Sequence, residues 1–140
     1  MLELEECERK FKLLWVSCSS LLRAVGHALH KVDSKRNDEL RKIVEEWWGT
    51  LKANREDHKI FFEFVERERN TILKEYELGF FSGEIDVLVR STGESFRLAE
   101  TAFCPMSSGA FEGEDCRDIA ASAINWWEEQ LCEIEQQSAP

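Results

Sequence analysis

One arginine in this sequence stands where a helix should be apolar. It is Arg69, in the stretch FVERERNTILKEYELG that covers residues 64–79. On a helical wheel of about 100° per residue, Arg69 falls inside an arc of apolar side chains, beside Val65, Leu73 and Tyr76. A guanidinium stays charged at ordinary pH, and burying it without a partner costs several kcal/mol. Arg69 is therefore expected to meet a carboxylate, a set of carbonyls, a cleft or a partner chain.

Two kinds of explanation account for Arg69. The structural kind is a salt bridge to an acid on another helix, or an aliphatic stem that packs while the guanidinium reaches water. The functional kind is a cleft in which the arginine binds an anion such as phosphate. Asn70, Lys74 and Tyr76 follow on the same helix and are the other candidate residues for an anion-binding site or an interface.

The residues around Arg69 resemble a known motif. Arginine followed by asparagine, in the C-terminal half of a helix of a small bundle, is similar to the HEPN domain. The best-known motif of that superfamily is Arg, four to six residues, then His. The resemblance spans residues 15–80 and includes SSLLRAVGHALHKV (19–32), VEEWW (44–48) and FFEFVERERNTILKEY (61–76). It implies a helical bundle and, in active HEPN ribonucleases, an Arg–His pair that cleaves RNA at a dimer interface without a metal.

The histidine of that motif is missing here. Its three permitted positions hold Lys74, Glu75 and Tyr76. Lysine is usually protonated near neutral pH and tyrosine has a pKa of about 10, so neither restores the acid–base pair. We therefore expect a non-catalytic HEPN-like module. The alternative is a divergent metal-independent ribonuclease in which Lys74 or Tyr76 replaces the histidine.

Four amphipathic segments must position these residues. Helices are expected over residues 2–32, 37–54 and 58–80, the last with Asp57 as N-cap, and a fourth helix from about Glu114. The first segment has apolar residues at alternating spacings of three and four, which is typical of a coiled-coil seam, and three further apolar residues broaden it into a core-facing stripe. The seam contains Leu4, Cys7, Phe11, Leu14, Cys18, Leu21, Val25, Ala28 and Val32, broadened by Trp15, Leu22 and Leu29.

Between the third and fourth segments the pattern changes. The stretch IDVLVRSTGESFRLAE (85–100) alternates apolar residues on both sides of a Thr-Gly turn, which predicts a β-hairpin. The stretch CPMSSGAFEGED (104–115) predicts a loop. The predicted fold is all-α: an up-and-down four-helix bundle with a short β-hairpin inserted before the last helix, in one domain over residues 1–140.

Composition and charge limit the function classes. The 140 residues are 43% hydrophobic and 33% charged, as in one soluble globular domain. No apolar run could span a bilayer and the charged start MLELEECERK is unlike a signal peptide, so we expect a cytoplasmic protein with no membrane contact. The net charge is −10, and residues 100–140 carry nine acids against Arg117 alone, a net −8. Nucleic acid is therefore disfavoured as a partner, and an acidic adaptor or antitoxin-like subunit that binds a basic protein is a further alternative.

No cofactor and no metal site are expected. His27 and His30 are three residues apart, but no carboxylate stands at ligand spacing. The five cysteines form no C-x-x-C pair and are expected to be reduced and structural. Each Trp-Trp pair, at 47–48 and 126–127, is expected to place one ring in the core and the other at an interface or over a broad core face. We therefore expect a homodimer that pairs through the Arg69 face of the third helix.

Overall fold

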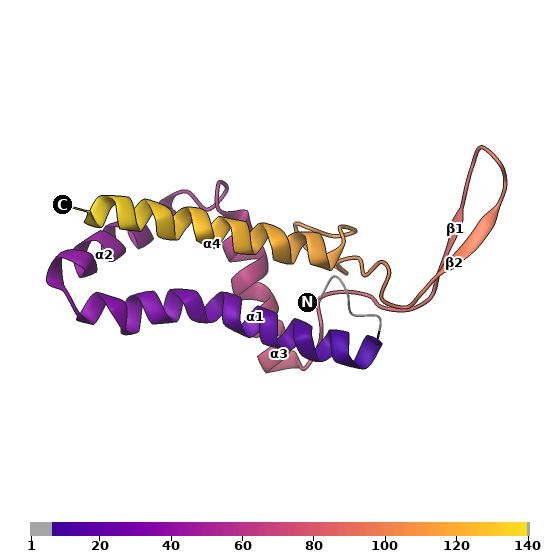
Figure 1. Ribbon diagram of the computed structural model, residues 1–140, viewed down its shortest axis with the longest axis horizontal. Helices are drawn as coiled ribbons and strands as arrows, with labels where there is room; N and C mark the ends of the chain where they lie inside the picture. The colour runs from indigo at the N-terminus through magenta and orange to yellow at the C-terminus, as the bar shows by residue number, and fades with distance from the viewer. Residues whose placement is uncertain (1–6, 140) are drawn as a thin grey trace.

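The computed structural model describes residues 7–139, and its architecture is mainly helical with one two-stranded sheet (Figure 1). The helical class and the position of the hairpin before the last helix are confirmed. No helix in the described range is both long and apolar enough to cross a membrane. The elements in chain order are α1 (Glu8–Lys31), the 3-10 turn η2 (Asp33–Lys35), α2 (Asp38–Ala53), the π-helix η3 (Ile60–Val65), α3 (Glu66–Glu75), β1 (Ile85–Leu88), β2 (Ser95–Leu98) and α4 (Cys116–Ser138).

The up-and-down order of the predicted bundle is not confirmed. In Figure 1, α1 and α4 lie side by side and run in the same direction, whereas strict alternation of four helices would make them antiparallel. The contacts agree: the Arg117 guanidinium lies 4.6 Å from the ring centre of Phe11. Farther along both helices, the Trp127 indole N–H donates to the carbonyl of Leu22 at 2.8 Å. The segment 76–115 thus returns the chain to the end of the molecule at which α1 begins.

The α1 helix has two apolar faces, and only one of them is fully buried. The core face consists of Phe11, Trp15, Ser19, Leu22, Gly26 and Leu29. The predicted seam runs beside it: among its described residues only Phe11 is buried, and Leu21 is 68% exposed. The prediction is wrong in this respect: Trp15, Leu22 and Leu29, which were expected only to broaden the seam, form the core face, and the indole of Trp15 supplies a large apolar surface there. Leu4, the first residue of the predicted seam, lies outside the described residues.

The predicted third helix, over 58–80, is shorter and less regular than expected. Its first part, η3, is a π-helix, and its second part, α3, ends at Glu75. A π-helical turn takes one more residue than an α-helical turn, so a wheel of uniform step misplaces every side chain that follows. The predicted arc around Arg69 is therefore wrong, and the N-cap of η3 is Lys59 rather than Asp57. The buried residues of η3 and α3 are Phe61, Phe64, Val65 and Glu68.

The helices α2 and α4 begin at polar caps that the sequence marks. The Asn37 side chain accepts a hydrogen bond from an amide of the first turn of α2 at 2.8 Å, and Asp115 does the same for the Arg117 amide at 2.9 Å in α4. Such caps satisfy amides that have no partner within the helix. The predicted helix over 37–54 is confirmed, and the fourth helix begins at Cys116, close to the predicted start.

The hairpin and the loop after it also follow the prediction. Strands β1 and β2 pair antiparallel with Ile85 opposite Leu98, and Figure 1 shows them projecting away from the helices. Residues 104–115 form no helix, and an isolated bridge between Phe80 and Met106 ties them to the chain that follows α3. This bridge brings the loop to the core at the end of the molecule where α4 starts.

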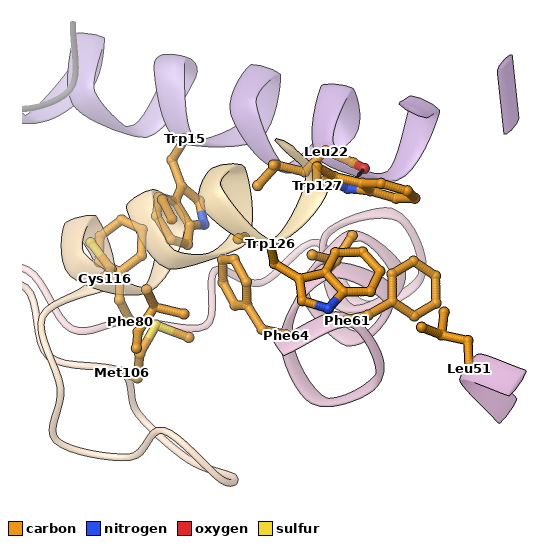
Figure 2. Close-up of a cluster of buried hydrophobic side chains, with 14 of the residues drawn as sticks. Trp15, Leu22, Leu51, Phe61, Phe64, Phe80, Met106, Cys116, Trp126 and Trp127 are labelled. Atoms are coloured by element: carbon orange, nitrogen blue, oxygen red, sulfur yellow. Dashed lines mark hydrogen bonds between the residues drawn. The ribbon is translucent and has the colours of Figure 1, made fainter. Parts of the chain in front are cut away.

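The core is rich in aromatic side chains (Figure 2). The Trp15 ring lies 5.1 Å from the ring of Phe80, edge-on, and 5.8 Å from that of Phe64. The Phe61 ring stacks on the Trp126 ring at 5.3 Å. These contacts join α1, η3, the segment after α3 and α4 in one continuous core.

The two Trp-Trp pairs differ from each other. Trp47 is buried and Trp48 is only half-buried, so one ring of this pair lies in the core and the other is partly exposed to solvent. Trp126 and Trp127 are both buried, with 7% and 3% exposure, so in α4 the pair follows the broad-core-face alternative rather than the interface alternative. The reason is that α4 packs against η3, α1 and α2, which cover more than one face of the helix.

Candidate functional site

Arg69 lies at the edge of the helical body rather than within the core. Its side chain is half-buried, and its guanidinium donates a hydrogen bond to Oδ1 of Asn70 at 3.1 Å. Within residues 7–139 it makes no ion pair with a carboxylate. This arrangement matches one of the two structural explanations, a packed stem with a guanidinium that reaches the surface.

Lys74 and Tyr76 do not form a compact site with Arg69. Lys74 is exposed near the end of α3. Tyr76 follows the helix as its C-cap, with φ 57° in the left-handed region and with 90% exposure. In the described part of the chain, no hydrogen bond or ring contact joins either residue to Arg69. Among residues 7–139, therefore, no acid–base pair is assembled around this arginine.

The buried polar residue of α3 is Glu68, which the sequence pattern did not single out. It is 5% exposed, and its Oε1 atom accepts hydrogen bonds from Trp15 Nε1 at 2.7 Å and from the Gly79 amide at 2.8 Å. Phe64 at the end of η3 and Glu68 in α3 are both buried, so both side chains lie on the inward side of this segment. In the sequence, Glu68 belongs to the charged run ERER (66–69) and resembles a surface residue. Its burial is explained only by Trp15 and Gly79, two hydrogen-bond partners that are distant from each other in the chain.

Asn70 and Lys74 line a cleft of about 520 Å³ between α3 and residues 106–108, which we call the acidic cleft. Arg69 is not part of its lining. Negative charge dominates this cleft and repels an anion. Its charge therefore does not favour the expected anion-binding role of Asn70 and Lys74. The lining acids are Glu63, Glu66, Glu68, Glu75 and Glu77, and the lining cations are Arg67 and Lys74.

A second depression, of about 540 Å³, lies between α1 and α4, and we call it the α1/α4 groove. Leu21 and Ile124 in its lining are 68% and 45% exposed. Burial raises the pKa of the Cys18 thiol, so the cysteine in this groove is a neutral, apolar side chain at ordinary pH. The lining consists of Leu14, Ser17, Cys18, Leu21, Leu22, Val25, Arg117, Ala120, Ala121, Ile124, Trp127, Glu128 and Leu131.

His27 and His30 border a third depression, of about 510 Å³, between α1 and α2. The His30 ring stands edge-on to the Trp48 ring at 5.6 Å, which places it against an aromatic wall. Across residues 7–139, no three histidine, cysteine, aspartate or glutamate side chains gather as metal ligands would. Cys18, Cys104, Cys116 and Cys132 are free thiols, and Cys104 and Cys116 are buried.

Comparison with protein-family models, with curated proteins and with solved structures finds no match for this chain. Function is therefore inferred from the geometry of the groove and of the two clefts.

Proposed function

We propose that this protein is a non-catalytic, HEPN-like interaction module that pairs with a second copy of itself through the α1/α4 groove. The observation that carries the proposal is the apolar seam of α1, part of which lines the groove: Cys18 and Val25 also pack against the core, whereas Leu21 is 68% exposed. Leu14, Cys18, Leu21 and Val25 follow one another at spacings of four, three and four, and all four line the groove.

The spacing of the seam favours a second helix of the same kind as its occupant. Alternation of three and four is the pattern by which two helices pack side chains into each other's gaps. A second copy of α1 carries the same seam, and a two-fold dimer requires such a self-complementary surface. The chain's own core already uses the neighbouring face of α1, with Trp15 and Leu22, and the exposed part of the seam around Leu21 remains available to a partner.

The character of the groove also fits a stable interface. Only Arg117 and Glu128 among its lining residues are charged, and permanent dimer interfaces are more apolar than the rest of a protein surface. Moving apolar surface out of water yields roughly 25 cal/mol per Å². Leu21 and Ile124 would contribute most, because they are the exposed large apolar residues of the groove.

The surface around Arg69 is a second candidate interface. Leu73 is 51% exposed and Tyr76 is 90% exposed. A bulky residue in the left-handed region costs roughly 1–2 kcal/mol, and retention of such strain is typical of positions that serve function. In this alternative, Arg69 with Asn70 beside it would form an ion pair or bind an anion at the interface, since the resemblance to HEPN domains implies that the motif arginine lies between two copies.

The test compares two leucines of α1 that differ only in their position. Leu21→Glu places a charge in the groove, whereas Leu13→Glu places it at a residue 61% exposed outside the groove. We expect the wild-type protein and Leu13→Glu to elute with the mass of a dimer in size-exclusion chromatography with light scattering. Leu21→Glu should elute as a monomer with unchanged helical circular dichroism, because a buried unpaired carboxylate opposes association.

Two further variants separate the candidate interfaces. Arg69→Leu and Tyr76→Ala alter only the α3 surface. If these variants dissociate the dimer and Leu21→Glu does not, the pairing surface is that of α3. A wild-type protein that remains monomeric at high concentration would contradict self-association through either surface.

A further inference from the structure

Two buried cysteines lie opposite each other where the chain returns from the hairpin to the start of α4. Pro105 and Asp115 form an isolated antiparallel bridge, and Cys104 and Cys116 are the next pair in its register. The Cys116 amide donates to the Cys104 carbonyl at 2.9 Å, which continues the pairing by one residue. Both cysteines are 0% exposed, and Figure 2 shows Cys116 within the core.

This register places the two side chains within reach of a disulfide bond. Residues that face each other across a hydrogen-bonded antiparallel pair have Cα atoms about 5.5 Å apart and share one face of the ribbon. A disulfide spans Cα separations of about 4.4–6.8 Å. The two thiols also form a hydrogen bond with each other, so the sulfur atoms are already neighbours. Cys18, in contrast, lies in the α1/α4 groove, and Cys132 is exposed farther along α4.

Hydrogen bonds on both sides of the segment hold the cysteines in this position. The Asp115 carboxylate accepts from the Arg117 amide at 2.9 Å and from the Cys104 amide at 3.4 Å. On the other side of the segment, the Phe81 amide donates to the Pro105 carbonyl at 2.9 Å. A bond between the two sulfur atoms therefore needs little movement of the backbone.

Burial makes the reduced thiols slow to react. It is the main cause that raises the pKa of both Cys104 and Cys116, and the charge of Asp115 acts in the same direction, while Arg117 opposes it. The thiolate is the form that attacks an oxidant, so reaction requires local opening of this segment. The same burial would shield a disulfide, once formed, from reductants.

We propose that Cys104 and Cys116 close into an intramolecular disulfide under oxidising conditions and thereby fix the segment between them to the start of α4. With a low-molecular-weight disulfide as the oxidant, one protein thiolate attacks a sulfur of the oxidant and releases one small thiol. The second protein thiolate then displaces the other small thiol and forms the protein S–S bond. The two cysteines thus lose two electrons and two protons, and the oxidant is reduced to two thiols.

The disulfide would restrain one wall of the acidic cleft. Met106, Ser107 and Ser108 line this cleft and lie between the two cysteines in the chain. The Arg67 guanidinium of α3 donates to the Ser108 hydroxyl at 3.2 Å, so this wall is in contact with α3. Closing a loop between two residues of the chain restricts the unfolded state and stabilises the fold. The proposal does not depend on self-association, because both sulfur atoms come from one chain.

The experiment incubates the full chain with excess oxidised glutathione and then maps its cysteines by non-reducing proteolysis and mass spectrometry. Urea below the unfolding transition accelerates the local opening that the buried thiols require. We expect a crosslinked peptide that joins Cys104 to Cys116 as the main oxidised product of these two residues. Glutathione adducts on them in place of the crosslink would overturn the proposal. So would two reduced thiols after the exposed Cys132 has been oxidised completely.

The stability of the oxidised protein distinguishes this disulfide from incidental oxidation. Its urea midpoint should lie at least about 1 M above that of the reduced protein and should return on treatment with dithiothreitol. Cys104→Ala and Cys116→Ala should each abolish this shift, whereas Cys18→Ala and Cys132→Ala should retain it. If a variant of a buried cysteine does not fold, the oxidised and reduced wild-type proteins decide alone. An unchanged midpoint on oxidation, or a shift that persists in Cys116→Ala, would overturn the proposal.

Discussion

The indole N–H of Trp15 in α1 donates to Oε1 of Glu68 in α3 at 2.7 Å, and both residues are buried. The same oxygen accepts a hydrogen bond from the Gly79 amide at 2.8 Å. One carboxyl group thus joins the first helix, the third helix and the chain that returns from it toward the core. Buried donors are costly to leave without acceptors, so this junction fixes where α3 lies against α1.

Removal of the Glu68 carboxyl should destabilise the fold. Glu68→Ala leaves the Trp15 indole N–H and the Gly79 amide without their acceptor, and we expect a loss of about 3 kcal/mol in the free energy of unfolding. Glu68→Gln retains an acceptor oxygen of the same reach and should lose less than half as much. Urea denaturation followed by circular dichroism measures both. Glu75→Ala, an exposed position of the same helix, is the control, and an equal loss there would contradict the role of Glu68.

Gly79 is predicted not to tolerate a side chain, because the Glu68 carboxyl occupies the space beside its Cα atom. A Cβ atom there would lie well inside van der Waals contact with Oε2 of Glu68. Gly79→Ala must therefore displace the carboxyl and break the bond to Trp15, at a cost of about 2 kcal/mol. In a Glu68→Ala background the same substitution should cost much less, because the clashing group is gone. Additive losses in this double-mutant cycle, measured by urea denaturation, would show that Gly79 acts independently of Glu68.

The amphipathic segments and the hairpin could be predicted from local signals. Asn37, Asp115 and the Thr-Gly turn act on their own neighbours in the chain, so the sequence alone reveals them. The burial of Glu68 could not be predicted, because its two partners come from elements distant in the chain. The π-helix η3, which precedes Glu68, could not be predicted from the sequence pattern either. Because of this element, Arg69 lies at the edge of the helical body and not in the expected apolar arc. The direction of α4 relative to α1 depends on the path of 76–115, which periodicity does not describe.

The stability of the protein should decrease as the pH falls below about 6.5. Burial lowers the pKa of His30 in the folded state, whereas in the unfolded chain it titrates near 6.5. The unfolded state therefore binds more protons below that pH, and the stabilisation present above pH 6.5 is lost as the pH falls through the folded-state pKa. Urea midpoints at pH 7.5, 6.5 and 5.5 should fall more steeply for the wild type than for His30→Gln. Parallel pH profiles for the two proteins would contradict this linkage.

RNA cleavage provides the test of the catalytic alternative around Arg69. In the structure, Lys74 is exposed and Tyr76 is 90% exposed beyond the end of α3, so neither is held beside the guanidinium as an acid or base. We expect the wild-type protein and Arg69→Ala to act alike on a mixed RNA pool in excess chelator, where contaminating metal-dependent nucleases are inactive. Cleavage by the wild type that disappears in Arg69→Ala would instead support a ribonuclease and make Lys74 and Tyr76 the next residues to replace.

The hairpin that projects from the helices should open locally more often than the helical body does. A two-stranded sheet alone is only marginally stable in water, and Leu88 and Phe96 are 65% and 52% exposed instead of packed. The side-chain contacts of the hairpin include two ion pairs of Arg97, with Asp86 at 2.9 Å and with Glu84 at 3.1 Å. Both pairs lie on the surface, where salt screens them. The amides of β1 and β2 should therefore exchange with solvent deuterium through local opening, faster in high salt, while those of α1 and α4 exchange only when the whole fold opens.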